Sequence, residues 1–248
     1  MSGASAVRVL TPEWPAPTGV RAAFSLRGGG VSEGGYASLN LGLHVGDDPA
    51  AVAENRRRLM QALSLPAAPQ WIEQVHGREV RELPLRGAPR PADALIARTP
   101  GAVAVVQVAD CLPVLFASRA APAVAVAHAG WRGLAAGVLE ATVAALDVPP
   151  GQLIAWLGPA IGPAHFEVGD EVRSALLADS SEDAMAFSPN VRGRWQCNLA
   201  HLARARLARA GVGALYGESP CTYTDAARFF SHRRAAPCGR MAALIWLA

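Results

Sequence analysis

The chain has 248 residues, 51% of them hydrophobic, a formal net charge of +3 at pH 7, and 23 basic residues that are all arginine. The absence of lysine excludes Schiff-base chemistry and a Walker-type phosphate loop, since both need that side chain. Short apolar runs, scattered arginines and the lack of a signal-peptide pattern lead us to expect a cytoplasmic protein, folded as one domain over residues 1–248, with no nucleic-acid or membrane partner.

The first part of the chain predicts a strand, a glycine-rich loop and a helix. The strand-like stretch ends near Arg27, and the loop that follows, residues 28–35, lacks the GxGxxG spacing of a dinucleotide-binding turn. Asp48 is expected to cap a helix that has Pro49 in its first turn. Within this helix, the arginines at 56–58 are interpreted as a solvent-exposed face.

The rest of the chain alternates short apolar runs with helical patterns. Runs at 102–108, 112–118 and 122–127 are typical of buried strands, and the turn-like segment before the last one favours an antiparallel pair. Further along, the sequence predicts helices over 131–147, 169–179 and 198–211 and strands over 153–158 and 241–248. These elements together predict a mixed α/β protein.

Three candidate metal ligands, His76, Cys111 and His128, fall where strand-like runs end. Strand ends hold side chains firmly and leave one side open to a substrate. Gly77 and Gly130 are expected to let the backbone approach these side chains closely. Two histidines and a thiolate leave the fourth position of a zinc ion free, which is the arrangement of catalytic zinc sites.

Three other interpretations of these residues remain open. Buried cysteines and hydrogen-bonded histidines also occur in ordinary protein cores. The same ligand set occurs in blue-copper sites, although six histidines without an HxH pair are too few for a multicopper oxidase. Finally, Cys111 could act as a nucleophile with His128 as its base, which needs no metal.

Further side chains are candidates for catalysis or anion binding. Asp110, next to Cys111, is expected to orient a ligand or to act as a general base. Arg27, Arg132 and Arg233 are candidates for binding phosphate, because a planar guanidinium group binds such anions through paired hydrogen bonds; each could also form a surface ion pair. The candidate general acids are Asp110, His232 and Asp225.

Longer motifs follow one another along almost the whole chain. They are FSLRGGGVSEGGYASLNLGLHVGDDP, QVHG, ADALI, ADCLPVLF, AHAGWRGLAAGV, LGPAIGPAHFEVGDEV, CTYTD, FFSHRR and CGRMAALIWL. With these motifs the sequence closely resembles the YfiH-like family, whose members are variously called laccase-domain proteins, polyphenol oxidases, purine nucleoside phosphorylases or peptidoglycan-editing factors. Leu26, where the family often has Thr, and Glu73, where Asn is common, depart from its pattern.

The resemblance implies a single-domain α/β sandwich of mixed β-sheets flanked by helices, similar to the catalytic domain of cytotoxic necrotizing factors. It implies a zinc ion on His76, Cys111 and His128, in a pocket that Arg27 and Asn40 also line. Zinc is expected rather than copper, and copper-dependent polyphenol oxidation is disfavoured.

The activities implied by the resemblance all concern small molecules. They are phosphorolysis of adenosine, inosine, guanosine and methylthioadenosine, and deamination of adenosine, although the HxE and PCxxC signature of nucleobase deaminases is absent. A second implied role is peptidoglycan editing, in which L-serine is removed from UDP-MurNAc-L-Ser. The expected partners are therefore a purine nucleoside, phosphate or a UDP-MurNAc derivative.

Overall fold

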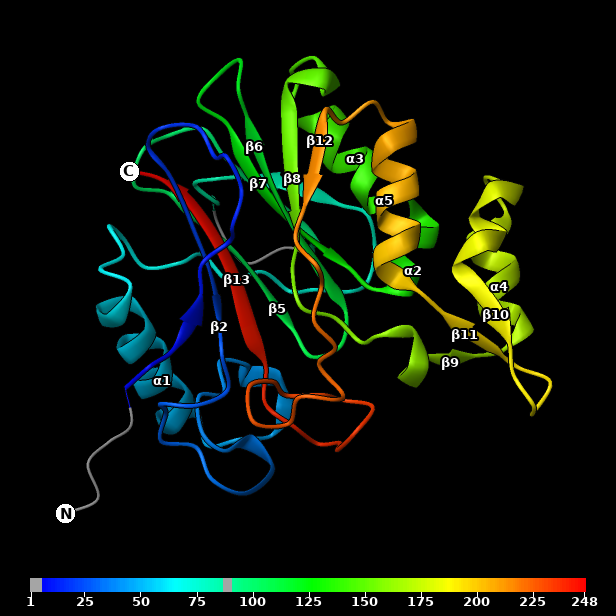
Figure 1. Cartoon of the computed structure of the whole chain (residues 1–248). Coiled ribbons are helices and arrows are strands. Elements are labelled where there is room, and N and C mark those ends of the chain that lie inside the picture. The colour runs from blue at the N-terminus through cyan, green and yellow to red at the C-terminus, as the bar shows by residue number, and fades with distance from the viewer. Residues whose placement is uncertain (1–5, 87–90) are drawn as a thin grey trace.

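The structure is a computed structural model that describes residues 6–86 and 91–248, which form three β-sheets (Figure 1). A four-stranded sheet has the strand order β1-β2-β13-β5, and a six-stranded sheet has the order β12-β8-β6-β7-β4-β3. A small sheet, β10-β11-β9, lies beside helix α4 at the lower right of Figure 1. Pairs β3–β4 and β8–β12 are parallel, whereas the other pairs are antiparallel, so the fold is a mixed α/β fold as predicted.

The elements have the following bounds. The four-stranded sheet contains β1 (Val9–Leu10), β2 (Val20–Ser25), β5 (Val103–Val108) and β13 (Met241–Leu247). The six-stranded sheet contains β3 (Val80–Glu82), β4 (Ala94–Ala97), β6 (Leu112–Ser118), β7 (Val124–Ala129), β8 (Leu153–Leu157) and β12 (Ala214–Tyr216). The small sheet contains β9 (Glu167–Val168), β10 (Phe187–Pro189) and β11 (Trp195–Cys197). The helices are α1 (Pro49–Ala62), α2 (Trp131–Ala136), α3 (Val138–Ala145), α4 (Asp170–Leu177) and α5 (Leu199–Arg209).

The two larger sheets pack face to face, and helices cover their outer faces (Figure 1). Between the sheets, Val106 of β5 and Val126 of β7 belong to one buried apolar cluster. Leu59 of α1 packs on the outer face of the four-stranded sheet, and α3 and α5 pack on the outer face of the six-stranded sheet. The predicted layered sandwich is therefore confirmed, because each buried strand has one apolar face for the other sheet and one for a helix.

Local sequence signals gave the ends of several elements correctly. The side chain of Asp48 accepts a hydrogen bond from the Ala50 N–H, 2.9 Å, and so caps α1 as predicted. Strands β6 and β7 form the predicted antiparallel pair. The helix predicted over 131–147 is instead two helices, because Gly137 has a left-handed backbone with φ of +84° that ends α2 and begins α3.

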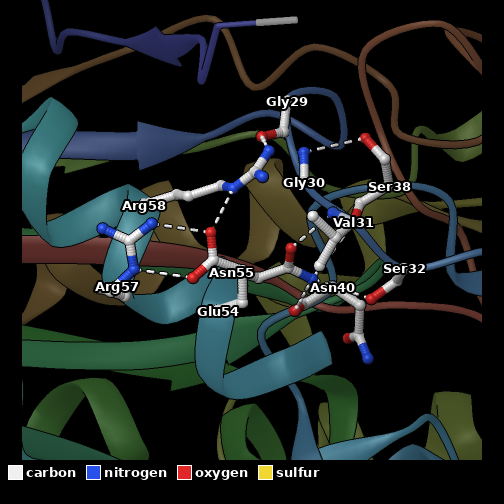
Figure 2. Close-up of polar contacts among 10 residues, drawn as sticks. All are labelled: Gly29, Gly30, Val31, Ser32, Ser38, Asn40, Glu54, Asn55, Arg57 and Arg58. Carbon is white, nitrogen blue, oxygen red and sulfur yellow. Dashed lines mark hydrogen bonds and ion pairs between the residues drawn. The ribbon is translucent and has the colours of Figure 1, made fainter. Parts of the chain in front are cut away.

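The arginines of α1 do not form one solvent-exposed face, so that prediction was wrong for Arg56. Its guanidinium lies 3.8 Å from the ring centroid of Trp71 and donates to the Leu41 carbonyl. This burial lowers the pKa of Arg56 to about 10. Arg57 is exposed as predicted, whereas Arg58 is half-buried; both pair with Glu54 (Figure 2).

The glycine-rich loop is tied to α1 by the fully buried side chain of Asn55 (Figure 2). Its amide oxygen accepts from the N–H of Val31, and its amide nitrogen donates to Ser32, to the Ser38 carbonyl and to the Asn40 carbonyl. The loop therefore has a defined shape that depends on the helix following it in the sequence.

In the ranges 6–86 and 91–248, no helix combines the length and the apolar character that a membrane crossing requires.

Candidate metal centre

The structure brings His76, Cys111 and His128 together from three separate segments. Cys111 directly precedes β6, His128 lies in the paired strand β7, and His76 lies in the loop before β3. The ligand atoms of the three side chains all lie within 4.8 Å of one another, and Cys111 Sγ is 3.8 Å from His76 Nε2. The rings of the two histidines meet edge to face, with their centroids 4.7 Å apart.

This arrangement fits a small divalent cation. Nitrogen and sulfur ligands of a tetrahedral zinc ion, with bonds of about 2.0 to 2.3 Å, are separated by roughly 3.3 to 3.6 Å. The distance between Cys111 Sγ and His76 Nε2 is close to that range. His76 is the exposed member of the cluster, so its side chain is the one least restrained by packing. The cluster is thus compatible with metal binding, with one coordination position left for a reactant.

A carboxylate that the sequence analysis did not select, Asp93, positions two of the three side chains. Asp93 is fully buried, and its Oδ1 accepts hydrogen bonds from Nδ1 of His128, 2.8 Å, and from the His76 N–H, 3.0 Å. Its Oδ2 accepts from the N–H groups of Gly77, 2.6 Å, and Val75, 3.2 Å. One side chain therefore sets the ring orientation of one candidate ligand and the backbone of another. The signal available in the sequence was an aspartate immediately before the buried strand ALIA.

Asp93 is held as a carboxylate by these partners. Burial raises its pKa, but the hydrogen bond and the charge of His128, together with the N–H groups of Gly77 and Val75, lower the pKa below its ordinary value. The histidine Nδ1 then donates to the carboxylate, and Nε2 points toward the cluster as the atom available to a metal ion.

Asp110, expected to orient a ligand or to act as a general base, makes its side-chain hydrogen bonds away from the three candidate ligands. Asp110 lines the same cavity, and its backbone has φ of +86°. Its two oxygens accept from the hydroxyl of Thr222, 2.6 Å, and from the N–H of Arg233, 2.7 Å. Asp110 thus attaches the C-terminal part of the chain to the cavity wall, and Asp93 supplies the orienting carboxylate.

In the metal-free protein, Cys111 and His128 favour a thiolate–imidazolium pair. Burial raises the pKa of the Cys111 thiol, but the positive charge of His128 and hydrogen bonds from both histidines lower it to about 6. Burial lowers the pKa of His128, but the Cys111 thiolate and Asp93 raise it to about 9. The thiolate is the form in which cysteine binds metals or attacks an electrophile.

These pKa values predict how metal binding depends on pH. Between about pH 6 and pH 9, Cys111 of the metal-free protein is a thiolate and His128 carries a proton that must leave before its Nε2 can bind a cation. Metal affinity should therefore rise about tenfold per pH unit over this window, with release of about one proton per ion bound. Calorimetric titration with zinc in buffers of different ionisation enthalpy measures the protons released. A zinc affinity that stays constant from pH 6.5 to 8.5 would contradict the prediction.

Gly130 lies against the cluster, and no larger residue fits there without displacement. A Cβ at Gly130 would be 2.8 Å from Cys111 Sγ and 3.1 Å from a ring carbon of His76. At Gly77 an added Cβ would meet its nearest neighbour at 3.6 Å, an ordinary contact. The predicted close approach of the backbone thus applies to Gly130 and not to Gly77.

Gly130→Ala is expected to weaken zinc binding about tenfold or more, because the added methyl group pushes on two candidate ligands. The backbone φ of −68° at this position suits alanine, so strain in the main chain is not the cause. Competition with a chromophoric chelator measures the affinity. The matched control is Gly151→Ala, since no atom of residues 6–86 or 91–248 outside the immediate neighbours lies within 4 Å of a Cβ added there. Equal affinities for the two variants would show that the cluster tolerates the displacement.

A cavity of about 460 Å³ opens beside the cluster and includes its three side chains in the wall. Its other charged and aromatic lining residues are His44, Asp110, Trp131, Arg132, Phe166, His232, Arg233 and Arg240. The guanidinium of Arg132 lies 4.4 Å from the ring centroid of Trp131, and that of Arg233 lies 5.3 Å from that of Phe166. In the part of the chain that the structure describes, neither of these arginines nor Arg240 forms an ion pair, so the three charges are available to an anion.

His44 and Arg240 are cavity residues that the sequence analysis missed. Burial lowers the pKa of His44, and the positive charges of Arg240 and Arg56 lower it further. The arginine charges therefore disfavour protonation of His44 and favour a negatively charged ligand in the cavity.

Arg27, in contrast to the resemblance-based expectation, is not among the residues that line this cavity. Its guanidinium donates to the carbonyls of Ala37 and Ala226, and it lies 4.8 Å from the ring centroid of Phe230. Through these contacts the Arg27 side chain joins the glycine-rich loop to the segment before β13. Its role in this structure is therefore to hold these two segments together. Burial, followed by the charge of Arg234, lowers the pKa of Arg27.

Asn40 also lies outside the cavity lining, because its side chain is fully buried. Its amide oxygen accepts from the N–H groups of Gly42 and Arg240, both at 2.9 Å, and its amide nitrogen donates to Asp47 at 2.8 Å. Asn40 thus fixes the backbone of Arg240, whose side chain does line the cavity. The expected contact with a substrate becomes an indirect one.

The two other candidate general acids differ in position. His232 is exposed and lines the cavity. Asp225 does not line it and forms an ion pair with Arg228, 2.5 Å, whose hydrogen bond lowers the pKa of Asp225. The interpretation of Asp225 as a proton donor in this cavity was therefore wrong, and His232 remains a candidate.

With the site described, similarity to known proteins identifies the family. Residues 21–248 match a protein family described as multi-copper polyphenol oxidoreductase laccase. The chain belongs to this family. It is 53% identical over 239 residues to a purine nucleoside phosphorylase of Pseudomonas aeruginosa, which covers 96% of this chain and 98% of the relative. It is 51% identical over 243 residues to purine nucleoside phosphorylase YfiH of Escherichia coli, over 97% of this chain and 99% of the relative.

Solved structures of family members have the same fold. A protein of Neisseria meningitidis assigned to the DUF152 family superposes with a TM-score of 0.91 at 48% identity, covering 96% of this chain and 98% of the other. YlmD of Geobacillus stearothermophilus superposes with a TM-score of 0.89 at 34% identity, covering 94% of each chain. The resemblance to the YfiH-like family that the motifs indicated is confirmed.

The family description mentions several copper ions, whereas the chain shows one cluster of the required kind. Among residues 6–86 and 91–248, His76, Cys111 and His128 form the one group of three or more histidine, cysteine or acidic side chains close enough to share a metal ion. Multicopper oxidases need many histidines around their copper cluster, and this chain has six in total. The cluster is compatible with a single metal ion.

Proposed function

We propose that the chain is a single-domain, zinc-dependent purine nucleoside phosphorylase. The observation that carries this proposal is the placement of the His76, Cys111 and His128 cluster in a cavity with three unpaired arginines. A cavity of about 460 Å³ is in the size range of small-molecule sites. Relatives that are more than 50% identical over nearly the whole chain are named purine nucleoside phosphorylases, which supports the same conclusion.

Zinc suits the cluster better than copper does. Two imidazoles and one thiolate with an open position are typical of catalytic zinc, whereas a blue-copper site adds a weak axial ligand that is usually methionine. No methionine is among the cavity-lining residues that the structure describes. A zinc ion on these residues would act as a Lewis acid that polarises an oxygen atom of a reactant.

The arginines of the cavity supply the phosphate site in this proposal. Phosphorolysis breaks the bond between C1′ of ribose and N9 of the purine and forms a bond between C1′ and a phosphate oxygen. Arg132, Arg233 and Arg240 neutralise and orient the phosphate, because guanidinium groups bind its oxygens bidentately. The rings of Trp131 and Phe166 offer flat apolar surfaces for the nucleoside.

The leaving purine needs a proton as its bond to ribose breaks. Both oxygens of Asp110 already accept hydrogen bonds, so this carboxylate is poorly suited to carry the transferred proton. His232 is exposed in the cavity and has no such engagement within the described residues, and we assign it as the proton donor.

The test uses adenosine, inosine, guanosine and methylthioadenosine with and without inorganic phosphate. We expect free base and ribose 1-phosphate, or its methylthio analogue, in a strict one-to-one ratio and only when phosphate is present. Chromatographic separation of base and nucleoside measures the products. Failure of all four nucleosides to release base in the presence of zinc and phosphate would refute the proposal.

Two further activities share the same centre and are tested in parallel. Adenosine deamination would give inosine in phosphate-free buffer. Peptidoglycan editing would release L-serine from UDP-MurNAc-L-Ser and leave the L-alanine form intact. The thiolate state of Cys111 beside His128 suits a nucleophilic route for that second reaction. L-serine release without any release of purine base would favour editing over phosphorolysis.

A further inference from the structure

Gln107 is a polar residue at the end of an apolar strand face. On β5, Val103 and Val105 point to the cluster of apolar side chains between the four-stranded sheet and α1. Gln107 follows with the same alternation, is 7% exposed and lines the cavity beside the candidate metal centre. Its amide oxygen is buried and accepts no hydrogen bond within the described residues.

This unpaired oxygen has a cost for folding. A buried acceptor without a partner loses its hydrogen bonds to water and gains no hydrogen bond in the protein. Leucine or methionine at the same position would avoid this desolvation free energy. Buried polar groups without partners are uncommon, and an absent ligand is one of the explanations for them. The position of Gln107 in the cavity wall makes a ligand the natural partner.

The main chain at Gln107 is unusually well fixed. The side chain of Gln74 donates to its carbonyl, 2.9 Å, and accepts from its N–H, 2.7 Å, and so takes the place of a neighbouring strand at the edge of the sheet. A ligand contact made by a side chain on so rigid a support needs little ordering of the protein on binding.

Gln107 also lies near an arginine of the phosphate site. A Cβ added at Gly42 would be 3.1 Å from the Gln107 amide oxygen and 2.8 Å from Cγ of Arg240, so the two side chains approach the same point. In phosphorolysis the phosphate attacks C1′, which places the ribose next to the phosphate and the far edge of the purine further away. A carbonyl oxygen repels the phosphate anion itself but accepts a hydrogen bond from a hydroxyl group.

We propose that the amide of Gln107 binds a hydroxyl group of the nucleoside ribose. This inference rests on the proposed phosphorylase function. It assigns Gln107 as a specificity-determining residue: it favours ribonucleosides over analogues that lack the hydroxyl group, because such an analogue leaves the buried amide unpaired.

The experiment combines enzyme variants with substrate analogues. Wild type and Gln107→Met, which has similar volume and no amide, are assayed on adenosine and on its 2′-deoxy, 3′-deoxy and 5′-deoxy analogues. For one analogue, we expect wild type to lose about tenfold in kcat/KM relative to adenosine, the amount that one neutral hydrogen bond supplies. Gln107→Met should lose the same factor on adenosine and should no longer distinguish adenosine from that analogue.

Three further measurements make the outcome decisive. Gln196→Met in β11 is the matched control: among the residues that the structure describes, the Gln196 side-chain oxygen is also buried without a partner, but it lies outside the cavity lining. It should leave the preference for adenosine unchanged. Gln107→Glu keeps an acceptor in place and should retain part of the preference, which protects the test if the methionine variant does not fold. Zinc content and unfolding temperature show that each variant is intact.

The proposal would be overturned if Gln107→Met, relative to wild type, lost the same factor in kcat/KM on adenosine and on all three deoxy analogues. So would a Gln107→Met effect that changes only the ratio of adenosine to inosine, because that result assigns the amide to the purine. If the wild type cleaves no nucleoside, the phosphorylase function itself fails, and the ribose contact falls with it.

Discussion

Cys111→Ala is expected to remove bound zinc and to reduce nucleoside phosphorolysis to background. The thiolate is the one anionic side chain in the cluster, and the histidines alone leave a weak two-nitrogen site. Losing one ligand of a zinc site should lower the affinity on the order of a hundred- to a thousandfold. Metal analysis of the purified variant and kcat/KM on inosine with phosphate measure the two effects.

The control for this variant is Cys221→Ala, which removes a second half-buried thiol that does not line the cavity. We expect it to keep both the metal and the activity. Retention of zinc by Cys111→Ala together with complete loss of activity would instead identify Cys111 as a nucleophile. Retention of both would remove Cys111 from the mechanism.

Asp93→Asn is expected to destabilise the metal-free protein by about 2 to 4 kcal/mol and to weaken zinc binding about 10- to 100-fold. The asparagine amide has one acceptor and adds a donor where Asp93 accepts four hydrogen bonds, three from consecutive N–H groups of residues 75–77 and one from His128. Urea unfolding of the metal-free protein and chelator competition measure the two quantities.

The comparison variant for Asp93 is Asp225→Asn, which removes a partly exposed carboxylate paired with Arg228. A surface pair of this kind contributes about 0 to 1 kcal/mol, so the free energy of unfolding should change little. An Asp93→Asn protein as stable as Asp225→Asn, with unchanged zinc affinity, would contradict the positioning role.

The pKa of Asp93 gives the pH range of its contribution. Folding lowers this pKa below the ordinary value of 3.8, so the unfolded chain binds the proton more tightly than the folded one. The stabilisation by Asp93 is therefore fully present above about pH 5 and is lost as the pH falls through the folded pKa. The difference in unfolding free energy between wild type and Asp93→Asn should shrink in acid accordingly.

Through Asp93 we expect metal binding and folding to be coupled at this site. The same carboxylate accepts hydrogen bonds from the His76 N–H and from the ring of His128. A displacement of either candidate ligand should therefore shift the other through Asp93. A metal ion bound to the cluster should accordingly raise the unfolding temperature of the whole chain, since the unfolded chain does not bring the three ligands together.

The sequence alone predicted the long buried strands, several helices and the three candidate ligands. Alternation and apolar runs predicted β5 to β7, because a strand buried on both faces must be apolar throughout. Asp48 marked a helix start, since the side chain of a capping residue bonds to backbone groups within three residues of itself. Each of these signals is local, and so it can be read without knowing the fold.

Only the tertiary structure decided what surrounds the candidate ligands. Asp93 is 35 residues from His128, and Asn40 is 200 residues from Arg240, yet each pair is joined by a hydrogen bond. Nothing in the local sequence distinguishes Asp93 from Asp110, because both are aspartates beside buried strands, yet the Asp110 carboxylate accepts from Thr222 and from the Arg233 N–H. The direction of a side chain beyond a strand end depends on partners from distant segments, and those partners meet only when the sheets pack.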